Sequence, residues 1–229
     1  MTVDFATDFT SDFTPDFRFS ALLEIDVQND FCPNGALAVN RGDEVTAPLN
    51  RLALVFSRHG GKVIATQDWH PGNHVSFASS HPGKKPGETI QTPDVAEQIL
   101  WPSHCVQGTA GAEFHKNLDV SPVQLIIRKG FHQELDSYSA FFENDQKTPT
   151  GLDGFLKGLG VKSVFLGGLA TDYCVYYSAM DAVKLGYKTF VLRDAVQGVG
   201  YPEGSVEKAF RLMEQAGICI IDSNNLKGA

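Results

Sequence analysis

The cysteine at position 174 lies where enzymes often place a nucleophile. The segment SVFLGGLATDYCVYYSAMDAVKLG, residues 163–186, predicts a buried strand over Ser163–Leu169, a tight turn, and a helix that begins near Cys174. Thr171 and Asp172 are candidate N-cap residues of that helix. Free backbone N–H groups and the positive end of the helix dipole favour a thiolate at such a position. The alternative is that Cys174 is a small buried hydrophobic residue, which is the commoner role of free cysteine.

The elements that must position Cys174 alternate between strands and helices along the chain. Apolar runs predict strands over Phe19–Gln28, Lys62–Asp68, Gln124–Gly130, Ser163–Leu169, Lys188–Arg193 and Ile218–Asp222. Amphipathic stretches predict helices over Val45–His59, Leu152–Leu159, the segment after Cys174, and Ser205–Ala216. This alternation predicts an α/β fold of three layers, α/β/α, with a central, mainly parallel six-stranded sheet.

Four side chains that could do chemistry are expected at one edge of this sheet, because ligands bind beyond the carboxyl ends of parallel strands. Asp26 lies near the end of the first strand, Asp68 ends the second, Lys129 lies at the end of the third, and Cys174 follows the fourth. Burying a carboxylate without a partner is costly, so we expect Asp26 to be paired. Each residue also has an ordinary interpretation: Asp26 as a cap, Asp68 as a turn former, and Lys129 as a solvated cation.

The long connection over residues 69–123 predicts a functional loop, because it has little predicted structure and exceeds the length of an ordinary connection. Asp68 and His70 are two residues apart at an extended strand end, where side chains point to the same side. One more imidazole, from His104 or His74, would give three protein ligands with room for water, as in catalytic sites for divalent metals. The alternative is a turn that carries surface histidines.

These segments together resemble the nicotinamidases of the isochorismatase-like cysteine hydrolase superfamily. The resemblance covers residues 19–222 and rests on five motifs: DVQNDF at 26–31, QDWHP at 67–71, WPSHCVQGT at 101–109, RKG at 128–130 and GLATDYCV at 168–175. It implies an amidohydrolase that converts nicotinamide to nicotinate and ammonia in NAD salvage through a cysteine thioester. Pyrazinamide, a close isostere, is expected to be a second substrate.

The resemblance also implies the role of each candidate residue at the reacting centre. Asp26, Lys129 and Cys174 would form the catalytic triad, with Asp26 as base and then acid, and with Lys129 favouring the thiolate. The oxyanion hole would consist of the backbone N–H groups of Ala170 and Cys174, beside a cis peptide bond between Leu169 and Ala170. With Lys129 and the helix N-terminus nearby, we expect a lowered pKa for the thiol.

The implied metal site and substrate pocket come from the long connection and its neighbours. The expected cofactor is one divalent transition metal, with zinc preferred and iron or manganese as alternatives. Its implied ligands are Asp68, His70 and His104, with His74 or water completing the shell. Three aromatic residues lie near the motifs and could hold a flat ring, although core packing is the ordinary role of such residues: Phe31, Trp101 and Tyr138.

Composition limits the alternatives. The 229 residues have a net charge of −8, which argues against nucleic acid as a partner, and no apolar run is long enough to span a membrane. Four cysteines without CxxC spacing and the absence of a signal-peptide pattern predict a reducing, cytoplasmic setting. We predict one hydrolase domain over residues 18–229, with the metal loop at 68–123, after an Asp-Phe-rich flexible extension over residues 1–17. A homo-oligomer is left open.

Two other functions remain open from the sequence. A related hydrolase, such as an isochorismatase or an amidase for N-carbamoyl or maleamate substrates, would keep the cysteine segment but generally lacks the metal loop. A non-catalytic binding protein on the same fold would be expected to have lost Asp26, Lys129 or Cys174, and all three are present. A redox role is disfavoured, because no CxxC pair is present.

Overall fold

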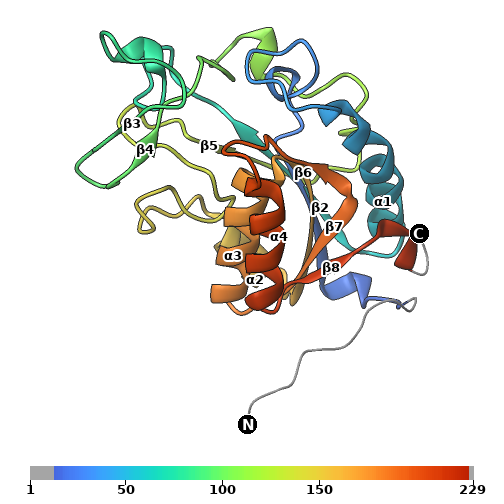
Figure 1. Cartoon of the computed structure of the whole chain (residues 1–229). Coiled ribbons are helices and arrows are strands. Elements are labelled where there is room, and N and C mark those ends of the chain that lie inside the picture. The colour runs from blue at the N-terminus through green and yellow to red at the C-terminus, as the bar shows by residue number, and fades with distance from the viewer. Residues whose placement is uncertain (1–12, 227–229) are drawn as a thin grey trace.

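The protein contains a six-stranded sheet in which every strand runs parallel to its neighbours, as seen in a computed structural model that describes residues 13–226 (Figure 1). The strand order is β5-β2-β1-β6-β7-β8. The strands are β1 (Ser20–Ile25), β2 (Lys62–Asp68), β5 (Leu125–Lys129), β6 (Ser163–Leu169), β7 (Lys188–Gln197) and β8 (Cys219–Ile221). A separate antiparallel ribbon of two short strands, β3 (Thr89–Ile90) and β4 (Gln98–Ile99), lies in the long connection.

Helices cover both faces of the sheet, which confirms the predicted three-layer α/β/α fold. The helices are α1 (Thr46–Arg58), α2 (Leu152–Gly158), α3 (Tyr176–Lys184) and α4 (Ser205–Gln215). The apolar side of α1 packs with Leu22 and Phe165 in one core cluster. The other three helices pack with Leu23 and Ile64 in a second cluster, on the opposite face (Figure 1). All six residues of β1 are buried for this reason.

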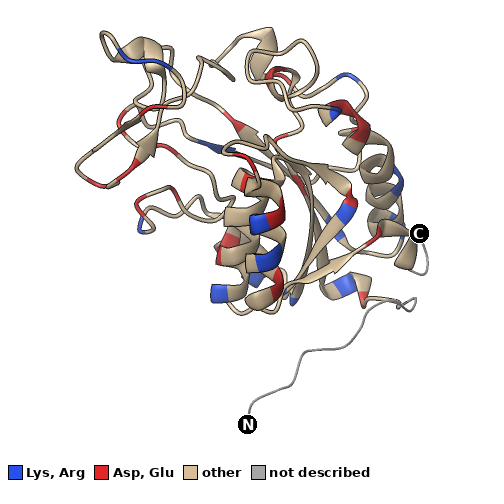
Figure 2. Cartoon of the chain, viewed as in Figure 1, with Lys and Arg blue, Asp and Glu red and all other residues tan. Residues whose placement is uncertain are grey.

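None of the helices within residues 13–226 combines the length and the apolar character needed to cross a membrane. Acidic and basic residues are interspersed along α3 and α4, whereas the charged residues of α1 are all basic (Figure 2). These helices therefore carry charged side chains, whereas the strand residues between the layers are largely apolar. Glu24 is an exception to that division.

Glu24 is a carboxylic acid in the middle of the central strand β1, with none of its side chain exposed. Among the described residues, neither of its carboxylate oxygens has a hydrogen-bond partner. Burial, with a smaller contribution from repulsion by Asp119, raises the pKa of Glu24 to about 8. The side chain is therefore protonated at neutral pH in the folded protein, although it ionises near pH 4.5 when the chain is unfolded.

We expect the substitution Glu24→Gln to stabilise the protein at neutral and alkaline pH. Because the folded-state pKa of Glu24 is raised, its contribution to stability is fully present below about pH 4.5 and is lost as the pH rises to about 8. The loss reaches on the order of 4 kcal/mol above pH 8. Urea unfolding of the wild-type protein and the variant at pH 5, 7 and 8.5 measures the difference in their free energies of unfolding. The advantage of the variant should grow with pH, and a constant difference between the two proteins would contradict the prediction.

The predicted elements are present, but three boundaries differ from prediction by more than one residue. Strand β1 ends at Ile25 rather than at Gln28, because Asp26 adopts a left-handed backbone conformation with φ of 48°. Strand β7 continues beyond the predicted Arg193 to Gln197. Cys174 lies inside one π-helical turn, Thr171–Val175, and α3 begins only at Tyr176.

The predicted N-cap role of Thr171 and Asp172 is wrong, because neither side chain caps this turn. The Asp172 carboxylate instead accepts hydrogen bonds from the backbone N–H groups of Val199 and Gly200 and from the Ser205 hydroxyl. Asp172 thus ties the turn that contains Cys174 to the loop between β7 and α4.

The predicted extension over residues 1–17 is wrong for its last five residues, and residues 1–12 lie outside the described part. Phe13 forms a bridge with Leu226, and its ring stacks on Phe190 with a centroid distance of 5.2 Å. Phe17 is buried and packs edge-on against Phe56 at 5.1 Å. Poor helix-forming residues surround these phenylalanines, but burial of two aromatic rings fixes the segment on the domain without a long helix.

Candidate active site

The four residues expected at one sheet edge do converge there. Asp68 and Lys129 are the last residues of β2 and β5, Asp26 directly follows β1, and Cys174 lies in the turn after β6. These four strands are neighbours in the order β5-β2-β1-β6, so their carboxyl ends lie side by side. The side chains of all four residues are buried.

Lys129 connects the other three residues. Its side chain is fully buried, and its Nζ lies 2.8 Å from Asp26 Oδ2 and 3.4 Å from Cys174 Sγ. It also donates hydrogen bonds to Asp68 Oδ1 and, at 3.0 Å, to the carbonyl oxygen of Ser137. Burial alone would lower the pKa of Lys129, but Asp26 and Asp68 outweigh burial and raise it well above its usual range. Lys129 is therefore a fixed positive charge at the centre of the site.

The expected lowering of the pKa of the Cys174 thiol is wrong for the resting site. Burial raises the pKa of this thiol well above its usual range, and the nearby carboxylates of Asp26 and Asp68 add to the effect. The Lys129 ammonium acts in the opposite direction but does not outweigh burial. The thiol is therefore protonated, and a carboxylate oxygen of Asp26 lies within 4.8 Å of its sulfur. Attack by sulfur requires transfer of that proton.

Asp26 is placed to receive the proton of the thiol. Burial raises the pKa of Asp26, and Lys129 offsets burial only in part. Asp68 is also buried, yet Lys129 and His70 hold its pKa below its usual range. Two carboxylates beside the same ammonium therefore differ in proton affinity, as is typical of acid–base sites. Asp26 suits proton transfer, and Asp68 stays ionised.

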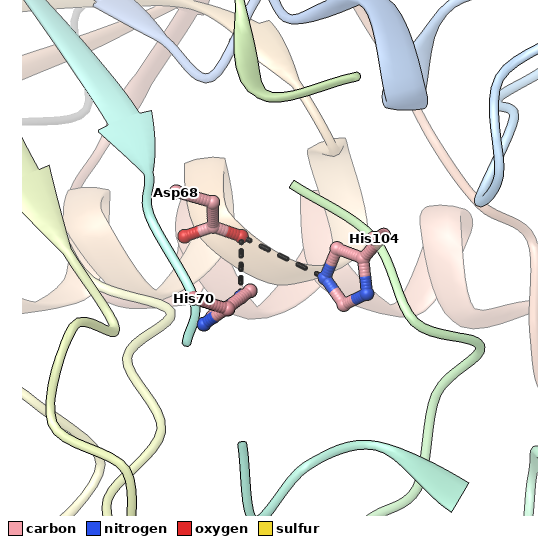
Figure 3. Close-up of side chains that lie close together, drawn as sticks. All are labelled: Asp68, His70 and His104. Carbon is pink, nitrogen blue, oxygen red and sulfur yellow. Dashed lines mark ion pairs between the residues drawn. The ribbon is translucent and has the colours of Figure 1, made fainter. Parts of the chain in front are cut away.

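Asp68, His70 and His104 face one another (Figure 3), and Asp68 also accepts a hydrogen bond from Lys129. Asp68 Oδ2 lies 3.4 Å from His70 Nε2 and 3.9 Å from His104 Nε2. The Nδ1 of His70 lies 2.8 Å from the carbonyl oxygen of Gly130, and the Nδ1 of His104 lies 2.8 Å from that of Pro102. A carbonyl only accepts, so each Nδ1 carries a proton and donates it.

Each Nδ1–H group is bonded to a backbone carbonyl, so the Nε2 atom of each of the two rings faces the Asp68 carboxylate. Burial, reinforced by the charge of His70, lowers the pKa of His104 to about 4, so its Nε2 has a lone pair at neutral pH. The negative charge of Asp68 raises the pKa of His70 despite burial. A cation bound between this lone pair and the carboxylate would be attracted by both. The backbone carbonyls that orient both rings are the outer partners usually found around metal-bound histidines, so the three residues fit a divalent metal.

His74, the additional candidate ligand, does not join this cluster. Its Nδ1 lies 2.7 Å from the hydroxyl oxygen of Ser76, and its Nε2 lies 3.2 Å from the carbonyl oxygen of Leu135. Its ring packs on His70 with a centroid distance of 4.2 Å. His74 instead belongs to a second group with His70 and Asp136, a carboxylate that the sequence analysis did not single out. As arranged, both ring nitrogens of His74 contact the protein.

A cavity that is open to solvent is lined by both Cys174 and His104, so it joins the cysteine to the histidine cluster. The three aromatic residues predicted to hold a ring, Phe31, Trp101 and Tyr138, all line it. The indole N–H of Trp101 donates to the Tyr138 hydroxyl at 3.1 Å, which fixes both rings. Further lining residues are Leu37, Asp68, His104, Asp136, Ala170, Tyr173, Cys174 and Val199. This lining of aromatic and apolar side chains with a few polar groups is typical of a small-molecule site.

Sequence reasoning missed four of these lining residues. Tyr173 adjoins Cys174 and could have been found by that position, and Asp136 precedes the Ser-Tyr pair at the pocket. Leu37 and Val199 are apolar loop residues, for which no local signal exists. The peptide bond between Leu169 and Ala170 is cis, as the resemblance implied.

Comparisons with known proteins agree with this architecture. The model of the isochorismatase domain matches residues 20–225. The chain belongs to the isochorismatase family. A nicotinamidase of Acinetobacter baylyi is 48% identical to this family member over 206 residues, which are 90% of the chain and 94% of the relative.

Solved structures of the same family superimpose along nearly the whole chain. A nicotinamidase/pyrazinamidase of Acinetobacter baumannii is 50% identical, with a TM-score of 0.86, and the match covers 93% of this chain and 99% of that one. A pyrazinamidase of Pyrococcus horikoshii in complex with zinc is 37% identical, with a TM-score of 0.72, and the match covers 89% and 99%.

Proposed function

We propose that this protein is a metal-dependent nicotinamidase, which hydrolyses nicotinamide to nicotinate and ammonia in NAD salvage. The observation that carries the proposal is the junction of two groups in one small cavity. Cys174, which has a carboxylate base and a fixed ammonium beside it, lines the same cavity as Asp68 and His104, which belong to the carboxylate and imidazole cluster. The nicotinamidases among the relatives support the choice of substrate.

In the first half of the reaction, Asp26 takes the proton of the Cys174 thiol as sulfur attacks the carboxamide carbon. The π bond of the carbonyl opens to an oxyanion, for which the N–H groups of Ala170 and Cys174 are the proposed donors. Asp26 then gives its proton to the amide nitrogen, the C–N bond breaks, and ammonia leaves a thioester behind. Lys129 favours the ionised form of Asp26, which is the form that can accept the proton.

In the second half, water replaces ammonia. Asp26, which is again a carboxylate, takes a proton from the water as its oxygen attacks the thioester carbon. The C–S bond breaks, nicotinate forms, and the proton on Asp26 returns to the sulfur. The chain is thus restored, and the overall reaction consumes one water for each amide.

The residues proposed to hold the metal are Asp68, His70 and His104, with zinc as the preferred ion. The pyrazinamidase of P. horikoshii was crystallised with zinc, which supports this choice. A metal at this position supplies a Lewis acid that binds the ring nitrogen or activates water. Asp68 serves both groups, because Oδ1 accepts from Lys129 while Oδ2 faces the imidazoles. Pyrazinamide has a ring nitrogen at the matching position and should also react.

Ammonia release from nicotinamide, measured before and after chelation, tests the proposal. We expect rapid release by the metal-loaded protein and a fall of at least about 100-fold after chelation, because the Lewis acid is lost. Zinc should restore the rate. If the metal-loaded protein releases no ammonia, the proposed substrate is wrong. If chelation leaves the rate unchanged, the metal has no part in the reaction.

The same preparation identifies the ligands. The variant His104→Ala should lose most of its bound metal together with its activity. His115→Ala is the matched control, since His115 lies in the same long connection but outside the cluster. Metal content by mass spectrometry should be unchanged in that control.

A further inference from the structure

The backbone of Asp26 departs from the strand that leads to it. Its φ of 48° is in the left-handed region, which residues with a Cβ seldom occupy. Such a conformation persists where surrounding contacts determine it. One of these contacts is a hydrogen bond of 3.1 Å from the Asp26 N–H to the Oγ1 of Thr66, on the neighbouring strand β2.

The same hydroxyl group also binds the Asp26 side chain. Thr66 Oγ1 donates to Asp26 Oδ1 at 2.6 Å, and Thr66 is fully buried. A hydroxyl has one proton and two lone pairs. Because one lone pair accepts the Asp26 N–H, the proton is left to point at the carboxylate. Thr66 therefore fixes both the backbone and one carboxylate oxygen of Asp26.

Fixing Oδ1 leaves Oδ2 as the oxygen that faces the reacting groups. Asp26 Oδ2 lies 2.8 Å from Lys129 Nζ, which in turn lies 3.4 Å from Cys174 Sγ. Rotation of the carboxylate would break the contact with Thr66 and move Oδ2 away from the ammonium. A base that accepts and returns a proton in each half of the reaction benefits from one fixed geometry.

We propose that Thr66 is a positioning residue that orients Asp26 for proton transfer through its hydroxyl, an inference that rests on the proposed function. Thr66 does not line the substrate cavity, so its effect on the reaction passes through Asp26. Serine retains the hydroxyl, whereas valine retains the shape and β-branching but loses both hydrogen bonds. The two substitutions therefore separate hydrogen bonding from packing.

The test compares Thr66→Val and Thr66→Ser with the wild-type protein under metal-loaded conditions. We expect Thr66→Val to lower kcat for nicotinamide by about 10- to 100-fold, the range of one hydrogen bond to a charged group, with an unchanged KM. Thr66→Ser should restore most of kcat. Thr189→Val is the control, since Thr189 is a buried strand threonine on β7 whose hydroxyl bonds the Tyr187 carbonyl.

Three results would overturn the proposal: an unchanged kcat in Thr66→Val, an equal loss in Thr66→Ser, or an equal loss in the Thr189→Val control. The rate at which iodoacetamide alkylates Cys174, read by peptide mass spectrometry, gives a second measurement that does not need nicotinamide. We expect it to be slower in Thr66→Val and restored in Thr66→Ser. If the wild-type protein fails to hydrolyse nicotinamide, the proposed function falls, while this alkylation rate still decides the role of Thr66.

Discussion

Replacing Cys174 by alanine is expected to lower the rate of nicotinamide hydrolysis by at least about 10⁴-fold, because in the proposed mechanism the sulfur is the group that forms the acyl intermediate. Asp26, Lys129 and the histidine cluster would remain in place, but without sulfur no thioester can form. The fold should survive, since the change removes one atom from a residue that borders a cavity. Steady-state ammonia release and bound metal, measured on the same preparation, check the prediction.

Cys219→Ala is the matched control for this substitution. Cys219 is a half-buried free cysteine on β8, the edge strand at the far end of the sheet from β5. The Cys219→Ala variant should therefore hydrolyse nicotinamide at the wild-type rate. Mass spectrometry of the wild-type protein quenched during turnover should detect an acyl adduct on Cys174 and none in the Cys174→Ala variant. Turnover that survives in Cys174→Ala would remove the nucleophile from the proposal.

The convergence of the four edge residues could be predicted because it follows from topology. Buried strands and amphipathic helices have different periods, and a parallel sheet places the residues that end neighbouring strands together. Asp68 and Lys129 are the last residues of β2 and β5, as the apolar runs indicated. The hydrogen bonds that hold the turn around Cys174 could not be predicted in this way, because Val199, in the loop after β7, and Ser205, at the start of α4, are distant from Asp172 in the sequence.

The pKa of the thiol shows why local patterns fall short of a mechanism. From the sequence, a helix N-terminus and a lysine near Cys174 indicated a thiolate. In the folded chain, burial and two carboxylates outweigh both. Burial is set by tertiary packing, and no segment of sequence around position 174 reports it. A buried, protonated thiol needs a nearby base before its sulfur can attack, and Asp26 is the proposed base.

The segment around Phe13 and Phe17 and the lining of the cavity also depend on tertiary packing that local sequence does not report. The residues around Phe13 and Phe17 form helices poorly, which indicated a flexible extension, yet their rings pack on the core. Leu37 and Val199 line the cavity from loops whose course depends on the rest of the fold. Aromatic residues near motifs, such as Trp101, could be predicted because the motifs themselves mark the site.

The pKa values of Asp26 and Asp68 differ because the two carboxylates have different neighbours. Both are buried and both contact Lys129, but only Asp68 also faces two imidazoles. Burial dominates at Asp26 and raises its pKa, whereas the surrounding positive groups dominate at Asp68 and lower its pKa. One lysine can therefore serve two carboxylates that do different work, provided that the cationic neighbours are distributed unequally.

Asp26→Asn is expected to lower the rate by about 10³- to 10⁴-fold, at the upper end of general acid–base effects, because Asp26 moves a proton in both halves of the cycle. An asparagine cannot accept the thiol proton, and one orientation of its amide would direct NH₂ at the Lys129 ammonium. Both the formation and the breakdown of the thioester should slow. Single-turnover measurements of ammonia and nicotinate separate these two steps.

Glu24→Gln is the matched control, because it makes the same acid-to-amide change at a different buried position. Glu24 is two residues earlier in the sequence, on the strand that leads to Asp26, and it is just as fully buried, but it contacts neither Lys129 nor Cys174. The same acid-to-amide change there should leave both steps at the wild-type rate. Equal losses in the two variants would mean that any acid-to-amide change at a buried position in this part of the sheet, rather than loss of the base at Asp26, lowers the rate. A loss confined to Asp26→Asn, with ammonia and nicotinate both delayed, identifies one carboxylate that serves both halves of the reaction.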